Sequence, residues 1–439
     1  MTIRHLRDYL TALGSMPTTG HVDFDGKIVV ASTRWPPCPE PSRGAGANRG
    51  RIMTGVDGIE LRVEEVSVGF ELGTIEDLRL RLSRSRRAPD LGHGWERGAP
   101  SAWTAELLDD WYRFDIDPLQ ARLDALTHYR AQVGDQHVHV IRVEGSGPQP
   151  LPLLLTHGWP GSFLEYLKLI PLLSEPEAHS GDPADAFTLI IPSLPGFAFS
   201  GPPPHAGRMA GDVARIWHRL MIDGFGYERY GAHGSDLGAG VTGWLARDHP
   251  DSLTGIHLAT PGLAVPADRR SAGEERFAEA VGRWAVEEGG YMHEHATKPA
   301  TLAAALADSP VGLAAWIGEK VVAWSSERAD GVPAFDRELL LSTLTLYWAT
   351  NTIATSLLPY WAYQHGDGAL PAGNPSPVPT SVTVFGGERV PFPKPPRELA
   401  ERFYNVTDWS EHPVGGHFPA VAEPEILANV IRRFFRPLR

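Results

Sequence analysis

The fold is decided by the stretch ERYGAHGSDLGAGVTGWLARDHP, residues 228–250. An apolar run ends at GSDLG (residues 234–238), and a helical pattern begins directly after it. Small residues on both sides of a central side chain permit the strained strand-to-helix turn that presents a nucleophile. The central residue is Asp236, and the positive end of the following helix favours its ionised, nucleophilic form. Taken alone, the junction is better explained by an aspartate that only caps the helix.

Outward from this turn, short apolar runs alternate with helical patterns. The runs are PLLLTHG, FTLIIPSLPG, ERYGAHGSD and LTGIHLATP, and the helical patterns are FLEYLKLIPLL, GDVARIWHRLMIDG and GVTGWLARDHP. This alternation predicts a mostly parallel sheet with helices on both faces. Helical patterns dominate residues 266–373, and the strand patterns SVTVFGG and YNVTDWSEHP return before the last helix. We therefore expect an α/β fold with a helical cap inserted before its last strands.

These patterns divide the chain into four regions. Residues 1–57 are either an ordered extension or upstream sequence joined by a wrong start, and they contain a possible hairpin around Asp25-Gly26 and a Pro/Gly-rich linker. Residues 58–147 mix strand and helix patterns. Residues 148–265 and 374–439 form the α/β core, and residues 266–373 form the cap.

The composition excludes several classes of protein. The 439 residues are 42% hydrophobic, enough to bury a large core. A net charge of -13 without a basic stripe argues against nucleic-acid binding. The single cysteine, Cys38, excludes an internal disulfide and a multi-cysteine metal site, and it fits a reducing compartment. With no signal-peptide pattern and no apolar run of about 18 to 20 residues, we expect a soluble cytoplasmic protein without a membrane partner, compatible with a homo-oligomer.

Two further loops complete a catalytic set with Asp236. Gly415-Gly416-His417 follows the last strand pattern, and glycines allow the imidazole to approach other backbone closely. Glu388 follows the strand pattern SVTVFGG. Nucleophile, acid and histidine in this chain order, each after a strand of one sheet, are typical of the α/β-hydrolase fold. The loop HGWPG (residues 157–161) either aims backbone N–H groups at an oxyanion or is an ordinary turn.

Other chemistries are less well supported by the residues. A formal G-x-G-x-x-G at residues 238–243 lacks the acidic residue that a dinucleotide site carries about 20 positions on. Ser235 lies one position before the centre of the turn, where a serine nucleophile would not be presented. The histidine pairs 137/139 and 293/295 lack a third ligand at metal-binding spacing. The sequence therefore predicts no metal and no cofactor.

Several longer motifs then resemble one family. HGWPGSFLEYLKLIPLL, GSDLG, GGYMHEHATKPATLAAALADSPVGLAAWIGEKVVAW, LYWATNTIATSLLPYW and GGHFPAVAEPE are similar to segments of the epoxide hydrolases of the microsomal type, from about Gly58 to the C-terminus. The resemblance implies that residues 58–147 wrap the core. It also implies that an epoxide is opened to a vicinal diol through an ester on Asp236, which water activated by His417 hydrolyses while Glu388 orients the imidazole.

The resemblance implies four further roles. Tyr291 and Tyr360, both in the helical insertion, would hold and protonate the epoxide oxygen, and Trp159 and Leu237 would supply the oxyanion-hole N–H groups. A tyrosine with a reference pKa of about 10 can donate to an alkoxide and stay protonated at neutral pH. Five tryptophans of the insertion suggest an apolar or aromatic pocket for the epoxide, although helix packing explains them equally well: Trp284, Trp316, Trp324, Trp348 and Trp361.

The sequence departs from the family pattern in places. Residues 1 to about 57 have no recognised counterpart, and the membrane anchor of animal members is missing. The acid loop FGGERVPFPKPP carries a small insertion, so Glu398 and Glu401 are alternatives to Glu388, although both lie in a helical pattern. A haloalkane dehalogenase would use the same triad but commonly has Trp after the nucleophile, where this chain has Leu237. A non-catalytic binding protein of the same fold is the other alternative.

Overall fold

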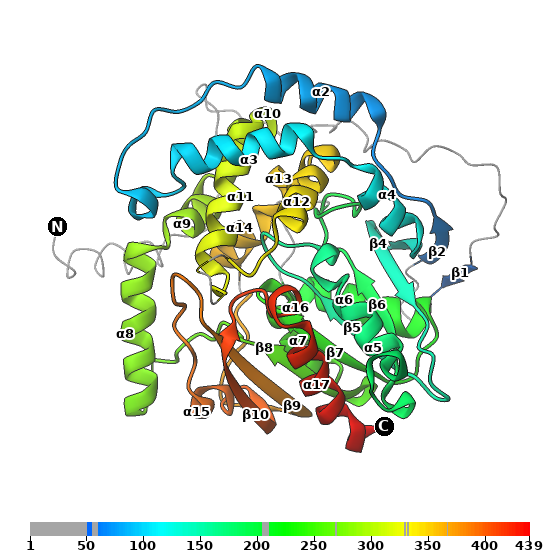
Figure 1. The fold of residues 1–439 in the computed structure, drawn as a ribbon. Coiled ribbons are helices and arrows are strands. Elements are labelled where there is room, and N and C mark those ends of the chain that lie inside the picture. Colours follow the sequence, from blue (N-terminus) through cyan, green and yellow to red (C-terminus); the bar gives the residue numbers. More distant parts are fainter. Residues whose placement is uncertain are drawn as a thin grey trace, which may run out of the picture. The chain divides into compact units, whose positions relative to one another are not determined.

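The computed structural model describes residues 51–439 apart from 55–59, 204–209, 268–269, 329–330, 332 and 367. The predicted hairpin and nearly all of the predicted linker fall in residues 1–50, outside the described residues. Within the described part, ten strands form one sheet in the order β1-β2-β3-β4-β6-β5-β7-β8-β9-β10 (Figure 1). The strands are β1 (Arg51–Thr54), β2 (Glu60–Val66), β3 (Thr127–Val133), β4 (Gln136–Val143), β5 (Leu151–Thr156), β6 (Phe187–Pro192), β7 (Tyr230–Ser235), β8 (Leu253–Ala259), β9 (Ser376–Gly386) and β10 (Tyr404–Gly415).

The sheet is antiparallel at one end and parallel through its centre. β1 to β4 pair antiparallel, and β4 also pairs antiparallel with β6. From β6 through β5, β7, β8 and β9 to β10 every pair is parallel. The carboxyl ends of these parallel strands therefore meet at one edge, where the loops that follow them can share a site. This is the α/β-hydrolase arrangement that the sequence predicts.

The central strands are buried on both faces because alternate residues enter two different cores. Leu153 and Leu155 of β5 pack in the cluster that contains α5 and α17, whereas Leu154 between them packs in the cluster that contains α6 and α7. Period-two alternation thus separates the two layers of helices. The core helices are α5 (Leu169–Ser174), α6 (Ala210–Arg219), α7 (Leu237–Asp248), α15 (Arg397–Ala400), α16 (Pro419–Ala422) and α17 (Pro424–Phe435).

The chain between β8 and β9 forms the helical cap. Its helices are α8 (Ala272–Glu287), α9 (Gly290–Thr297), α10 (Pro299–Asp308), α11 (Pro310–Trp324), α12 (Arg337–Thr350), α13 (Ile353–Ser356) and α14 (Leu358–His365). In the described residues no single helix is long and apolar enough to cross a membrane, although α10 and α11 together, bent by 114°, pass on length and composition.

The N-terminal segment packs on the cap as well as extending the sheet. Its helices are α2 (Leu72–Ser83), α3 (Ser101–Arg113) and α4 (Asp117–Asp124), and α2 and α3 lie against α11 (Figure 1). The buried indole of Trp111 in α3 donates a hydrogen bond of 2.9 Å to Thr345 in α12. At Gly318 in α11 a Cβ atom would lie only 2.7 Å from the Trp103 ring, so the absence of a side chain there lets the helices approach.

Three regions of the chain differ from the sequence prediction. The sequence pattern places residues 51–54 in the extension, but they form β1 and pair with β2 as an edge strand. β3 and α4 were not anticipated within the mixed segment. The pattern FLEYLKLIPLL predicts one helix, whereas the chain forms a 3-10 turn at Phe163–Tyr166 and then the short α5.

Candidate active site

Asp236 occupies a strained turn between β7 and α7. Its φ of 50° lies in the left-handed region, which non-glycine residues rarely adopt. The two glycines around it are required by close packing: a Cβ at Gly234 would lie 2.1 Å from the Gly238 carbonyl oxygen, and one at Gly238 would lie 1.9 Å from the Thr156 carbonyl oxygen. The structure thus gives Asp236 the geometry of a nucleophile elbow rather than that of a simple helix cap, and the helix has no side-chain cap hydrogen bond from it.

The HGWPG loop after β5 holds the Asp236 carboxylate. The Trp159 backbone N–H donates to Asp236 Oδ1 at 2.7 Å, a short charge-assisted hydrogen bond. Gly158 makes this approach possible, because a Cβ there would lie 2.2 Å from the same oxygen. Leu237, the other expected N–H donor, begins α7 directly after the nucleophile. A backbone donor already aimed at this carboxyl group needs no rearrangement to stabilise charge that develops on it.

His417 approaches Asp236 from the loop after β10. Its Nε2 lies 3.5 Å from Asp236 Oδ2. The two preceding glycines have positive φ, and a Cβ at Gly416 would lie 2.7 Å from the Trp324 carbonyl oxygen. The same carbonyl accepts the His417 backbone N–H at 2.9 Å. Burial lowers the pKa of His417 from its usual value, although the charges of Asp236 and Glu388 oppose this, so the imidazole is disposed to be a neutral base near pH 7.

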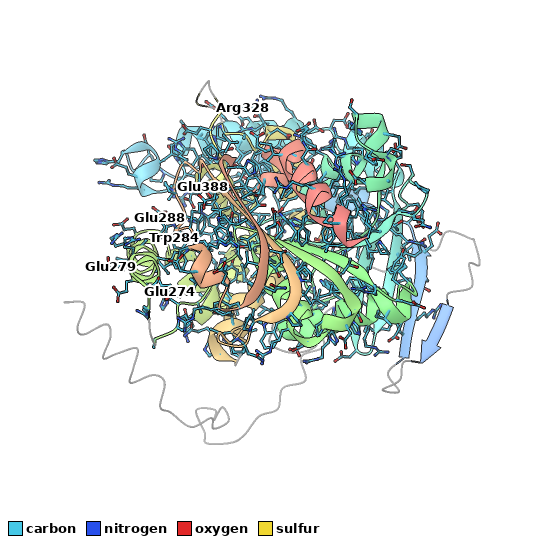
Figure 2. The ribbon with its side chains drawn as sticks, turned by 90° about the horizontal axis from the view of Figure 1, so that it is seen from below. Glu274, Glu279, Trp284, Glu288, Arg328 and Glu388 are labelled. Atoms are coloured by element: carbon cyan, nitrogen blue, oxygen red, sulfur yellow. The ribbon has the colours of Figure 1, made fainter. Side chains whose placement is uncertain are left out.

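Glu388 lies at the same end of the site. It follows β9 and, with a side chain only 2% exposed, lines the pocket together with Trp284 of α8, which Figure 2 also labels. The two alternatives from the sequence lie elsewhere: Glu398 accepts a hydrogen bond from Ser271, and Glu401 pairs with Arg397 at 2.7 Å.

Glu388 has an ionic partner that the sequence pattern does not predict. The ammonium of Lys394, six residues later, donates a hydrogen bond to Glu388 Oε1. Among the described residues, Lys394 is the side chain that contacts the Glu388 carboxylate. Glu388 acts on His417 through its charge, without a direct hydrogen bond between them. The sequence FGGERVPFPKPP indicates an unusual loop, but it does not predict that Lys394 contacts Glu388.

Tyr291 and Tyr360 face the nucleophile from the cap. They come from α9 and α14, which pack together, and both line the pocket with Asp236. Burial raises the pKa of each hydroxyl well above its usual value, and the negative charge of Asp236 raises it further. Both side chains therefore stay protonated near neutral pH and can donate hydrogen bonds or a proton.

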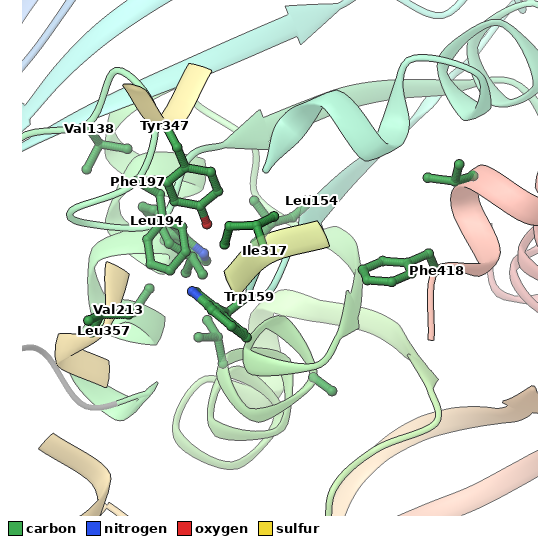
Figure 3. Packing of buried hydrophobic residues seen from close by; sticks show 14 of the residues in the cluster. Val138, Leu154, Trp159, Leu194, Phe197, Val213, Ile317, Tyr347, Leu357 and Phe418 are labelled. Atoms are coloured by element: carbon green, nitrogen blue, oxygen red, sulfur yellow. The ribbon is translucent and has the colours of Figure 1, made fainter. Parts of the chain in front are cut away.

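The Trp159 side chain supports these tyrosines. Its fully buried ring stacks on Tyr291, with centroids 5.4 Å apart and planes 10° from parallel, and meets the Tyr360 ring edge-on at 5.9 Å. Figure 3 shows the Trp159 ring within the apolar cluster that contains Leu194 and Leu357. The ammonium of Lys320 lies 4.9 Å from the centre of the Tyr291 ring, where its positive charge favours the phenolate that Tyr291 becomes when it gives up its proton. Trp159 thus places its backbone N–H at the nucleophile and its ring against both cap tyrosines.

A second buried carboxyl group, Glu165, lies behind the HGWPG loop. It fills the space beside Gly161, where a Cβ would lie 1.2 Å from its Oε1. Burial and the charge of Asp236 raise the pKa of Glu165 to about 8. The group is therefore mainly protonated at neutral pH and adds little negative charge beside the nucleophile. No pattern in the sequence predicts this arrangement.

One histidine of each pair considered as a metal ligand is engaged in protein contacts. His139 bonds to His128 at 2.8 Å and to Ser193 at 2.9 Å, and His295 accepts the Trp316 indole N–H at 3.1 Å. No group of three His, Cys, Asp or Glu side chains that could hold a metal ion occurs in the described part of the chain.

An aspartate elbow, a facing histidine and a helical cap over a parallel sheet together define a hydrolase of the α/β fold. The family models described as epoxide hydrolase N terminus and alpha/beta hydrolase fold match residues 63–166 and 152–281. The chain is 37% identical over 370 residues to a putative epoxide hydrolase of Stigmatella aurantiaca, covering 83% of both chains. It is 33% identical over 393 residues to epoxide hydrolase 1 of Oryctolagus cuniculus, covering 82% of this chain and 86% of the relative. The chain belongs to the epoxide hydrolase family, of the microsomal type.

Solved structures agree with this assignment. The Aspergillus niger epoxide hydrolase superposes with a TM-score of 0.74 at 26% identity, over 86% of this chain and 96% of that one. The juvenile hormone epoxide hydrolase of Bombyx mori superposes with a TM-score of 0.72 at 28% identity, over 86% and 94% of the two chains. The fold and family expected from the sequence are confirmed, and the protein is an enzyme that acts on a small-molecule epoxide and water.

Proposed function

We propose that this epoxide hydrolase works through a covalent ester on Asp236, which water activated by His417 then hydrolyses. The observation that carries the proposal is the position of the Asp236 carboxylate, 2.7 Å from the Trp159 N–H and 3.5 Å from His417 Nε2, in a pocket lined by two protonated tyrosines. Nucleophile, proton donors and base are then distributed around one small volume.

In the first step a carboxylate oxygen of Asp236 attacks one epoxide carbon. A carbon–oxygen bond of the ring breaks as the ester bond forms, and the negative charge moves to the former epoxide oxygen. Tyr291 and Tyr360 donate to that oxygen, and one of them supplies its proton. Removal of a positioned general acid typically costs about 10² to 10⁴-fold in rate, so the pair accounts for several kcal/mol of the barrier.

In the second step water adds to the ester carbonyl carbon. His417 takes a proton from the water, which the lowered pKa of the imidazole permits at neutral pH. The Trp159 N–H stabilises the oxyanion, a contribution of roughly 10² to 10³-fold for one donor. As the tetrahedral intermediate collapses, its bond to the diol oxygen breaks and the His417 imidazolium, stabilised by the negative charge of Glu388, gives its proton to that oxygen. The remaining proton of the water restores the tyrosine hydroxyl that donated in the first step and leaves Asp236 as the carboxylate.

The pocket favours an uncharged, apolar epoxide. Its volume is about 580 Å³, and its walls include Trp244, Phe277 and Leu370. Among the described residues that line it, the acidic groups are Asp236 and Glu388, which belong to the proposed catalytic set. An anionic substrate would find no lysine or arginine among these residues, and a cationic one would meet only the two carboxylates that the reaction uses, so a charged substrate would lose its hydration without compensation.

Oxygen tracing tests the proposed chemistry. With enzyme in excess over epoxide in H₂¹⁸O, the first diol should carry unlabelled oxygen from Asp236, and the aspartate should retain the ¹⁸O. Direct attack of water on the epoxide would put ¹⁸O into the diol during that first turnover and contradict the proposal. A chloroalkane assayed in parallel should release no chloride, whereas a dehalogenase would release it.

A further inference from the structure

The loop after Glu388 is fixed to the end of α11 rather than loose. Glu388 forms an isolated antiparallel bridge with Ser326, and the Val390 N–H donates to the Ala323 carbonyl at 2.8 Å. This is the loop in which the sequence carries its small insertion. Its backbone therefore has a defined path at the site.

Lys394 is held in this loop by its neighbours. It lies between Pro393 and Pro395, whose rings fix the backbone, so little conformational entropy is lost when its side chain is placed. Its ammonium returns to Glu388 Oε1, with side chains 26% and 2% exposed for lysine and glutamate. An ion pair this well covered is screened far less than a surface pair.

The same loop also covers the imidazole. The Phe392 ring stacks on His417 with centroids 5.3 Å apart and planes 24° from parallel. The charged groups that act on His417 are Asp236 from the elbow, and Glu388 and Lys394 from this loop.

The other side chains against the imidazole are aromatic, and the Trp159 backbone also hydrogen-bonds to it. Trp324 at the end of α11 contacts the His417 ring at 5.0 Å, and the Lys320 ammonium of α11 lies 5.8 Å from the Trp324 ring, paired with Glu319 at 2.7 Å. Phe418 meets the imidazole edge-on. Among these groups Lys394 is the cation whose charge acts on His417, and it also contacts the Glu388 carboxylate whose charge acts on the same imidazole.

We propose that Lys394 is a positioning residue of this site: it holds the Glu388 carboxylate charged and in place, and so sets the pH above which His417 can act as a base. The proposal rests on the base role proposed above for His417. The imidazole can take a proton from water only while it is neutral. With Glu388 ionised, the pair of His417 and Glu388 then carries one negative charge. A cation against the glutamate weakens the hold of this pair on an additional proton. Lys394 thus extends hydrolysis of the ester to lower pH.

The direction of the Lys394 effect follows from its charge. Burial lowers the pKa of Lys394, but the contact with Glu388 opposes this and favours the charged amine. Without the lysine, its positive charge would no longer offset the negative charge of Glu388, and the His417 imidazole would bind a proton more readily. The rate constant of ester hydrolysis would then begin to fall at a higher pH on the acid side of its pH profile.

The test measures the protonation of His417 in the free enzyme by NMR, on protein with labelled histidine. The chain has 18 histidines, and the signal of His417 is assigned by its loss in His417→Gln. In Lys394→Met the titration midpoint of His417 should rise by about one pH unit, and Lys394→Arg should restore it. The rate constant for decay of the covalent ester should show the same shift of its acid limb.

Arg389→Met is the matched control. Arg389 lies in the same loop but pairs at the surface with Glu327, 3.8 Å away, so its removal should move the His417 midpoint by a few tenths of a pH unit at most. An unchanged midpoint in folded Lys394→Met, or equal shifts in Lys394→Met and Arg389→Met, would overturn the proposal.

A second comparison keeps the test decisive if Lys394→Met alone does not fold. Glu388→Gln alone should lower the His417 midpoint, and the double change Glu388→Gln/Lys394→Met should raise it again without burying an unpaired carboxylate. Equal midpoints in these two proteins would also overturn the role of Lys394. The NMR arm needs no epoxide, so it decides this point even if turnover measurements refute the function proposed for the site.

Discussion

Gly158→Ala should slow ester formation sharply while leaving the protein folded. The new Cβ would lie 2.2 Å from Asp236 Oδ1, whereas real Cβ contacts below 3.0 Å are essentially never seen, so the carboxylate or the loop must move by about 0.8 Å. That movement breaks the 2.7 Å hydrogen bond from the Trp159 N–H. A displacement near 1 Å at a reacting group can cost about 10²-fold in rate.

The assay is rapid mixing of enzyme with epoxide, with the ester quantified by intact mass. Gly282→Ala is the matched control, since nothing lies within 4 Å of a Cβ at that position in α8 and alanine is the better helix former. The control should keep the parental rate and gain up to about 1 kcal/mol of stability. Parental ester formation in Gly158→Ala would show that the contact between the HGWPG loop and Asp236 is unimportant.

Three further outcomes follow from the same structure. Tyr291→Phe or Tyr360→Phe alone should slow ester formation modestly, and the double change should cost about 10² to 10⁴-fold; parental rates in the double variant would remove both from the mechanism. Burial lowers the pKa of His233 to about 4, so its contribution to the free energy of unfolding is present above the usual pKa near 6.5 and falls by about 3 kcal/mol as pH drops to 4. Denaturant titrations should show this loss, and His233→Gln should reduce the fall in the free energy of unfolding between pH 6.5 and 4 by this amount. Trp111→Phe removes the hydrogen bond to Thr345 and should lower the free energy of unfolding by about 1 to 3 kcal/mol in the same titrations, whereas an unchanged value would argue against a role for this contact in holding the cap.

The fold was predictable because its signals are local. The runs that became β5 to β8 are apolar on both faces, and the helices between them carry their own periodicity. The elbow was readable for the same reason, since Gly234 and Gly238 are needed by backbone contacts within a few residues of Asp236 and from the adjacent strand. Elements with weaker patterns, such as β3, were missed because their burial comes from pairing with strands on either side.

The rest of the site depends on contacts between distant segments. Lys394 meets Glu388 only because the proline-rich loop turns back, and no periodicity records that path. The Trp159 ring meets Tyr291 across about 130 positions of sequence, through the docking of the cap on the core. Glu165 sits in the middle of an apolar pattern, where its carboxyl group gave no indication of the space that Gly161 leaves for it.

The central claim is a covalent ester on Asp236, and the intact mass of His417→Gln after reaction with an epoxide tests it most directly. Attack by Asp236 does not need the base, but hydrolysis of the ester does, because water is a weak nucleophile without one. The variant should consume about one equivalent of epoxide, stop, and gain the whole mass of the substrate, with peptide mapping placing the adduct on Asp236. A folded, substrate-binding His417→Gln protein that shows no adduct, or that carries it on Ser235, would contradict the account.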